Sequence, residues 1–195
     1  MISSRISGKV VLITGAGKGI GKKLALALCQ KGAIVAANDI TPINVDPVVE
    51  ECRKNGGIAK AYIHDIAKKV DLQTMVNNLV TDQGRIDVLI NTANVNFPGN
   101  ILDIDEWDLH RIFEVNAIGT LLTIQSVGRV MRAAGNGMII NCAQIKSDST
   151  ASYIASRSGL NNLQSALVEE FTAYGIKVVT TATNDPFQEI LAFLT

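Results

Sequence analysis

One glycine-dense stretch decides the fold of this chain: Thr14-Gly15-Ala16-Gly17-Lys18-Gly19-Ile20-Gly21. It follows the apolar run Val10-Val11-Leu12-Ile13, which predicts a strand buried on both faces, and it precedes a helical pattern over 20–30. A glycine-rich turn between a buried strand and a helix exposes backbone N–H groups beside the positive end of the helix dipole. Glycine also permits positive φ and a close approach of phosphate to backbone. The stretch therefore predicts a dinucleotide-binding turn.

Strands and helices alternate along the rest of the chain. Short apolar runs predict further strands at 33–37, 58–63, 86–90, 138–142 and 176–179. Helical patterns cover 47–54, 67–83, 105–134, 152–174 and, more briefly, 186–195, and we expect irregularity near Asn116 and Gly119. This alternation predicts an α/β fold, a Rossmann-type doubly wound parallel sheet of about six strands. Residues 1–195 are expected to form a single NAD(P)-binding domain.

Composition narrows the class of protein and of partner. Hydrophobic residues make up 47% but aromatic residues only 5%, so the core must be aliphatic. The 18 basic and 18 acidic residues balance, which argues against a nucleic-acid or membrane-surface partner held by net charge. The three cysteines lack the spacing of a zinc site or a disulfide framework, so no metal is expected. Without a secretory leader or a membrane-length apolar run, a cytoplasmic location is expected.

An acidic residue closes the second predicted strand. Asp39, followed by Ile40, can hydrogen-bond the ribose hydroxyls of an adenosine and would repel a 2′-phosphate. Lys18 opposes this preference, because a cation in the glycine turn would attract that phosphate. The position of Asp39 is the more direct of the two, so the sequence favours NAD over NADP.

At this point the chain resembles the short-chain dehydrogenase/reductase family over residues 7–180. The matching elements are Thr14-Gly15-x-x-x-Gly19-x-Gly21, Asp39, Asp65-Ile66, Asn91-x-Ala93, Asn116-Ala117-x-Gly119 and Tyr153 with Arg157 four residues later. The resemblance implies that the cofactor is bound by Gly15, Gly17, Lys18, Gly19, Ile20, Gly21, Asp39, Ile40, Asp65, Ile66, Asn91, Ala93, Tyr153 and Arg157.

The resemblance also implies a chemistry, namely hydride transfer between nicotinamide and a small alcohol or carbonyl compound. Tyr153 would be the general acid and base, and Asn116 would orient a water for the proton relay. Arg157 stands where the family keeps a lysine whose charge lowers the tyrosine pKa. Gln144 stands where the family keeps a serine that holds the substrate oxygen. The implied catalytic residues are therefore Tyr153, Arg157, Asn116 and Gln144.

Several positions depart from the family's pattern. Ser147, Ser149 and Ser152 lie near Gln144 and are either substitutes for the missing serine or solvated loop residues. Thr183-Asn184 replaces a Pro-Gly turn, and the family's substrate lid and last edge strand have no counterpart here. The leading hypothesis is an NAD-dependent oxidoreductase. The alternative is a catalytically weak or inactive dinucleotide-binding protein that acts through oligomerisation or partner binding.

Two predicted helices carry more apolar residues than the single face that must cover the sheet. These are the helices at 105–134 and 152–174, which the family pairs across a dimer. The resemblance therefore implies a homodimer or homotetramer formed through them.

Overall fold

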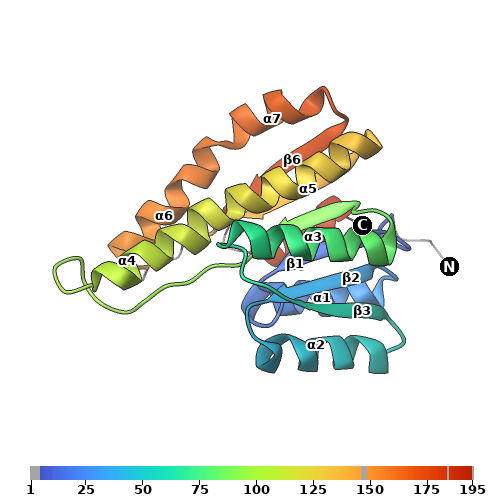
Figure 1. Cartoon of the computed structure of the whole chain (residues 1–195), viewed down its shortest axis with the longest axis horizontal. Coiled ribbons are helices and arrows are strands. Elements are labelled where there is room, and N and C mark those ends of the chain that lie inside the picture. Colours follow the sequence, from blue (N-terminus) through green and yellow to red (C-terminus); the bar gives the residue numbers. More distant parts are fainter. Residues whose placement is uncertain (1–4, 146–148, 184, 195) are drawn as a thin grey trace.

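The computed structural model describes residues 5–145, 149–183 and 185–194, and its helices and strands alternate as expected (Figure 1). The strands are β1 (Val10–Thr14), β2 (Ile34–Asp39), β3 (Ile58–Ile63), β4 (Val88–Asn91), β5 (Gly137–Cys142) and β6 (Ile176–Thr181). The helices are α1 (Gly19–Gln30), α2 (Pro42–Lys54), α3 (Lys69–Gln83), α4 (Glu106–Phe113), the π-helix η1 (Glu114–Gly119), α5 (Thr120–Ala134), α6 (Ala151–Asn162), α7 (Gln164–Thr172) and α8 (Pro186–Leu194).

The six strands form one parallel sheet in the order β3-β2-β1-β4-β5-β6. The chain leaves β1 toward β2 and β3, then crosses back to place β4 on the other side of β1. This reversal makes a topological switch point, where ligands bind at the carboxyl ends of the strands. Thr14 pairs in register with Asn38 on one side and Asn91 on the other. The predicted glycine turn therefore begins at the switch point.

Two aliphatic cores cover the two faces of the sheet. Val11 and Ile13 of β1 belong to the core shared with α1, α2 and α8, whereas Val10 and Leu12 belong to the core shared with α3, α5 and α7. Side chains alternate across a strand, so a run that is apolar at every position must be buried on both faces. The fold is the predicted single Rossmann-type domain.

Two predicted helices have different bounds in the structure. We predicted that a helix begins near Pro47, but α2 begins at Pro42, whose missing N–H is harmless in the first turn. Pro47 instead lies inside α2, where it removes one backbone donor. The segment predicted as one helix over 152–174 is divided into α6 and α7 at Leu163. Gln164 begins α7 and binds β6, through Nε2 to the Val178 carbonyl at 2.8 Å.

The expected irregularity near Asn116 is confirmed as the π-helix η1 between α4 and α5. The Asn116 side chain is buried and holds two segments together. Its Oδ1 accepts a hydrogen bond from the Val95 N–H at 2.8 Å, and its Nδ2 donates to Ser156 Oγ at 3.0 Å. The widened turn thus ties the segment after β4 to α6. Among the described helices, none combines the length and apolar character needed to cross a membrane.

Candidate active site

The glycine turn is shaped by close backbone contacts. A Cβ on Gly15, whose φ is +68°, would lie 2.7 Å from the Ala93 Cα, and a Cβ on Gly21 would lie 2.2 Å from the Gly15 carbonyl oxygen. A Cβ on Gly17 would lie 2.6 Å from an Asp39 carboxylate oxygen. Larger residues at these positions would displace the backbone. The three glycines therefore bring the turn against the ends of β2 and β4.

The start of α1 faces a cavity of about 400 Å³ and is open to an anion. Lys18 occupies the N-cap position in extended conformation and makes no side-chain capping hydrogen bond. The first N–H groups of a helix need an external acceptor, and phosphate is a good one. The cavity is lined by Gly15, Lys18, Gly19, Ile20, Gly21, Asn38, Asp39, Ile40, Asn44, His64, Asp65, Ile66, Thr92, Ala93, Asn94, Val95, Arg111 and Val115.

Asp39 ends β2 and points its carboxylate toward the glycine turn. Its Oδ2 accepts a hydrogen bond from the Gly17 N–H at 3.2 Å. Its Oδ1 accepts hydrogen bonds from the Thr41 N–H at 3.2 Å and from Asn44 Nδ2 at 3.4 Å. A carboxylate has about four acceptor sites, so this arrangement holds it in place and leaves capacity for a ligand hydroxyl. The residues around the cavity thus fit the adenosine half of a dinucleotide.

Asp65 also lines this cavity. Its Oδ2 accepts a hydrogen bond from Arg111 Nη2 of α4 at 2.9 Å, and its Oδ1 accepts the Ala67 N–H at 3.0 Å. The neighbouring His64 is bonded through Nδ1 to Asp71 Oδ1 at 2.7 Å, and this contact lowers the pKa of the Asp71 carboxyl. The wall is therefore fixed by side chains from α3 and α4.

A second cavity, of about 610 Å³, adjoins the first at Gly19, Ile20 and Asn94. It is lined in addition by Lys23, Asn96, Cys142, Gln144, Ser149, Tyr153, Arg157, Asp185, Pro186 and Phe187. Together these two adjoining cavities make up the cleft at the carboxyl ends of the strands. Within the described residues, no cluster of three or more His, Cys, Asp or Glu side chains is arranged to hold a metal ion.

Tyr153 and Arg157 lie one turn apart on α6 and both line this second cavity. Burial raises the pKa of the Tyr153 phenol, whereas the charge of Arg157 lowers that pKa and Cys142 raises it. The Tyr153 hydroxyl donates a hydrogen bond to Asn94 Oδ1 at 3.4 Å. Burial also lowers the pKa of Arg157, whose side chain is only 2% exposed. A phenol beside a buried cation is a suitable group for proton transfer near a reacting oxygen.

Most of the residues predicted for the site line the cleft, including Gln144 and Ser149. Gly17, Asn91 and Asn116 are outside its walls. Gly17 supports Asp39, and Asn91 Nδ2 donates to Asn141 Oδ1 at 2.9 Å between β4 and β5. Ser152 contacts Thr150 Oγ1 at 3.2 Å and does not line the cleft. Ser147 and Asn184 lie outside the described residues.

Several polar residues that line the cleft were not predicted as site residues, and three of them contact residues that were. Asn94 contacts Tyr153, Asn44 contacts Asp39 and Arg111 contacts Asp65. Asn94 follows the Asn91-x-Ala93 element, so its position was a usable signal. The partners of Asn44 and Arg111 depend on how α2 and α4 pack, which no local pattern specifies.

Comparison with known proteins identifies the family. The model of the short chain dehydrogenase family matches residues 9–184. The chain belongs to this family. An uncharacterised oxidoreductase of Thermotoga maritima is 37% identical over 175 residues, which cover 88% of this chain and 69% of the relative. A D-threitol dehydrogenase of Mycolicibacterium smegmatis is 32% identical over 182 residues, which cover 90% of this chain and 69% of that enzyme.

Solved structures of the family agree with the fold. A metagenomic short-chain oxidoreductase in complex with NADP matches with a TM-score of 0.89 and 28% identity, over 98% of this chain and 91% of that one. An NAD+-bound xylitol dehydrogenase matches with a TM-score of 0.85 and 27% identity, over 91% of this chain and 70% of that one. This short-chain dehydrogenase is an NAD(P)-dependent oxidoreductase that transfers hydride to or from a small-molecule substrate.

Proposed function

We propose that this short-chain dehydrogenase interconverts a small alcohol and its carbonyl compound with NAD(H), with Tyr153 as the general acid and base. One observation carries the proposal. The cavity that holds the glycine turn and Asp39 shares three wall residues with the cavity that holds Tyr153 and Arg157. A dinucleotide site and a proton donor thus share one cleft.

The chain's own residues supply everything except the hydride, which a bound nicotinamide gives or accepts. In the reductive direction the Tyr153 hydroxyl gives its proton to the developing alkoxide, and in the oxidative direction the phenolate takes it back. Arg157 stabilises the phenolate by its charge, against the effect of burial. The Gln144 amide, which faces the same cavity, donates a hydrogen bond to the substrate oxygen.

Asn116 is proposed to orient the water of the proton relay. Because its side chain does not line the cleft, this proposal rests on its hydrogen bonds. It binds the backbone of Val95 at both its N–H and its carbonyl, and it binds Ser156 on α6. Through these bonds it holds the segment that carries Asn94 next to the helix that carries Tyr153. Asn116 therefore holds Asn94 beside Tyr153, and its proposed role remains to orient a water for the proton relay.

A fluorescence titration with NADH, followed by assays on neutral ketones, tests this proposal. Binding with turnover is expected, and binding without turnover would favour an inactive dinucleotide-binding protein. Gln144→Ser should raise kcat on a neutral ketone by about 10- to 100-fold, if serine restores a better-placed donor. The matched control is Gln30→Ser at the exposed end of α1, which should leave kcat unchanged. Equal rates for Gln144→Ser and the parent would contradict the expected gain from a better-placed donor.

NAD is proposed as the preferred cofactor. The Asp39 carboxylate lies at the glycine turn, where a 2′-phosphate would meet its negative charge. Lys18 also lines the cavity and reduces this discrimination without reversing it. The dissociation constant of NADPH should exceed that of NADH by at least about tenfold, a difference of about 1.4 kcal/mol. Equal constants would contradict the preference.

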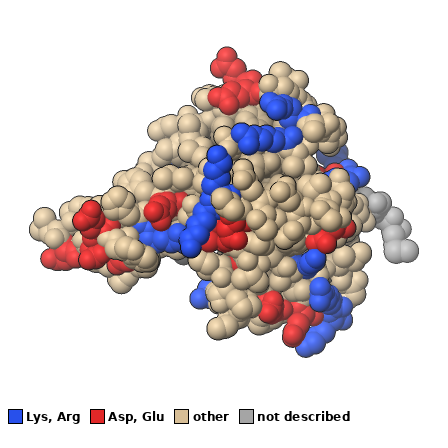
Figure 2. All heavy atoms as spheres, in the orientation of Figure 1, with Lys and Arg blue, Asp and Glu red and all other residues tan. Residues whose placement is uncertain are grey.

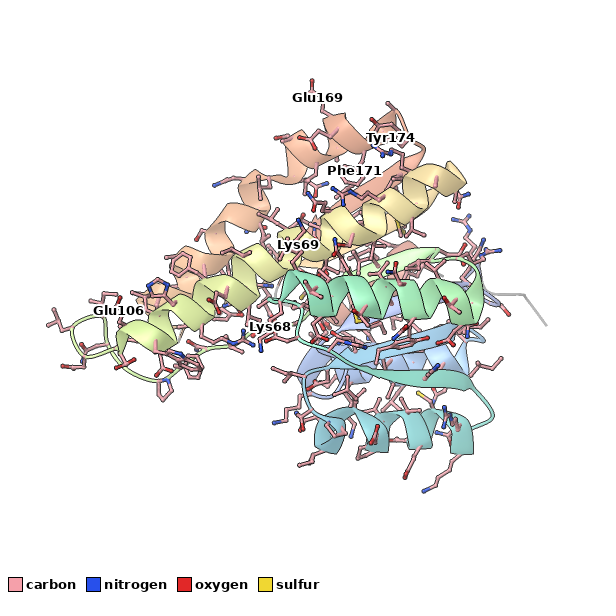
Figure 3. The ribbon with its side chains drawn as sticks, in the orientation of Figure 1. Lys68, Lys69, Glu106, Glu169, Phe171 and Tyr174 are labelled. Carbon is pink, nitrogen blue, oxygen red and sulfur yellow. The ribbon has the colours of Figure 1, made fainter. Side chains whose placement is uncertain are left out.

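A homodimer or homotetramer is proposed through the helices of residues 105–134 and 152–174, whose segments α5 and α7 line one outer groove. Figure 3 labels two residues of this groove, Phe171 on α7 and Tyr174 in the turn that follows α7. A Cβ on Gly128 of α5 would lie 2.6 Å from the Phe171 ring, so the two helices pack tightly beneath the groove. Leu121 remains 41% exposed at its edge. Burial of these apolar groups would stabilise a dimer.

Sedimentation tests the oligomer directly. The parent should sediment as a dimer or tetramer, and Leu121→Glu should shift it toward monomer because it places a charge in the apolar contact. Ile43→Glu on α2, at a side chain that is 83% exposed, is the matched control and should not change the mass. A monomeric parent would refute the assignment.

A cytoplasmic location is also proposed. Cys29, Cys52 and Cys142 are all free and buried, as is usual for a protein of a reducing compartment. Fractionation of the source cells would test this, and recovery outside the cytoplasm would contradict it.

A further inference from the structure

Arg157 is a buried cation whose charge the described part of the chain leaves uncompensated. Its side chain is 2% exposed, and its Nε donates no hydrogen bond within that part. The groups whose charges act on it are the Tyr153 phenol and the Cys142 thiol, and burial raises the pKa of both, so both are neutral at neutral pH. A buried charge without an anion or a full set of acceptors is unfavourable. An anionic ligand would relieve this cost.

The cavity around Arg157 favours an anion. Lys23 of α1 lines the same cavity and adds a second positive charge at its exposed side. Among the lining residues that the structure describes, Asp185 is the one acidic side chain, and its Oδ1 already accepts the Gln188 N–H at 3.2 Å at the start of α8. The balance of formal charge among the described lining residues is therefore positive. A guanidinium offers two parallel N–H groups, a geometry that matches a carboxylate.

We infer that Arg157 binds the carboxylate of the substrate, which is thus an oxo or hydroxy carboxylic acid. The inference rests on the proposed function and names the substrate class for that same site. Tyr153 and Arg157 are separated by one helical turn, which places their side chains about 5–6 Å apart at Cβ. A substrate oxygen at Tyr153 and a carboxylate at Arg157 must then be close in the same molecule.

The cavity at the glycine turn differs from the cavity around Arg157, because it contains the groups that would bind the cofactor's phosphates. The glycine turn and the uncapped start of α1 supply the phosphate-binding groups of the cleft, together with Lys18. Arg157 does not line that cavity. Its anion is therefore assigned to the substrate rather than to the phosphates of the cofactor.

Matched acids and amides test the inference with NADH and the full chain. Acetoacetate is compared with acetoacetamide, and pyruvate with pyruvamide. Each amide keeps the shape of its acid but turns N–H donors toward the guanidinium. The parent should prefer the acid in kcat/KM, and Arg157→Gln should lower the acid-to-amide ratio by about 10- to 100-fold, the range of a hydrogen bond to a charged group. A loss of activity caused by a changed pKa of Tyr153 affects the acid and the amide equally, so it cancels in the acid-to-amide ratio of kcat/KM.

Lys22→Gln is the matched control, because Lys22 neighbours Lys23 on α1 but lines neither cavity. It should leave the ratio unchanged. Arg157→Lys should restore part of the preference, since it returns the charge without the planar fork. An unchanged ratio in Arg157→Gln, or a parent that prefers the amides, would overturn the inference. A weaker affinity for NADH with an unchanged ratio would also overturn it and assign Arg157 to the cofactor.

If no compound is turned over, the proposed function fails, but carboxylate binding by Arg157 can still be tested by thermal denaturation. In the presence of NADH, each acid should raise Tm more than its amide in the parent but not in Arg157→Gln. Equal shifts in the parent would overturn the inference. Removal of an unpartnered buried charge should not prevent folding.

Discussion

The Gly21→Ala substitution probes the glycine turn most sharply. The added Cβ would lie 2.2 Å from the Gly15 carbonyl oxygen and 2.6 Å from Thr92 Oγ1. Both neighbours are held, since Thr92 Oγ1 donates to the Thr14 carbonyl and Gly15 follows directly in the turn. The turn must therefore move by about 1 Å to restore an ordinary contact.

This movement displaces the N–H groups that would bind phosphate. Loss of about two hydrogen bonds to a charged group costs about 3 kcal/mol, which raises the dissociation constant of NADH about 100-fold. The free energy of unfolding should also fall by about 1–3 kcal/mol, because the core of the turn is overpacked.

Fluorescence titration of NADH measures the first effect, and urea unfolding measures the second. The matched control is Gly159→Ala in α6, where an added Cβ meets nothing within 4 Å. That substitution should leave NADH binding unchanged and add about 1 kcal/mol of stability, from the better helix propensity of alanine. A folded Gly21→Ala protein with the parental dissociation constant would refute the assignment of the turn to the cofactor.

Three further predictions follow from charged groups. Burial raises the pKa of Tyr153, whereas the charge of Arg157 lowers it. Arg157→Met should therefore shift the pH at which the rate of alcohol oxidation increases to a higher value. An unchanged pH–rate profile would show that Arg157 does not lower the pKa of Tyr153. Asp87 accepts the Val10 N–H at 2.8 Å and pairs with Arg85, so Asp87→Asn should lower the urea-measured free energy of unfolding by about 1–3 kcal/mol. These contacts hold the pKa of Asp87 below its ordinary 3.8, so the stabilisation it gives is complete above that pH and should be lost as pH falls through the folded value. Asp39→Ser should narrow or reverse the preference for NADH over NADPH, and an unchanged ratio of dissociation constants would contradict the role of Asp39.

The strands and the cofactor turn could be predicted from sequence because their signals are local. A short run such as Val10–Ile13 is apolar at every position only when both faces of the sheet are covered. The glycines mark places where backbone meets backbone, and Gly15 and Gly21 do so. The role of Asp39 was predicted from its place at the end of the second strand, and that of Tyr153 from the family resemblance. The structure adds the hydrogen bonds of both side chains.

Other features depend on packing between distant segments. The pairing of Asp65 with Arg111 joins the end of β3 to α4, and nothing in either segment specifies the other. Pro47 suggested a helix start, but Pro42 takes that position, because the first turn tolerates proline equally well at either residue. The burial of Arg157 depends on how α6 packs beside α4 and η1 (Figure 1). Figure 2 shows acidic and basic side chains interspersed on the viewed face, in keeping with the balanced charge.

The central claim is that Tyr153 transfers the proton in a reaction driven by a bound nicotinamide. The direct measurement is the rate of NADH oxidation with a panel of ketones and oxo acids, for the parent, for Tyr153→Phe and for the control Tyr174→Phe. We predict that Tyr153→Phe loses about 10²–10⁴-fold in kcat with little change in NADH affinity, and that Tyr174→Phe matches the parent. Equal rates for Tyr153→Phe and the parent would contradict the account.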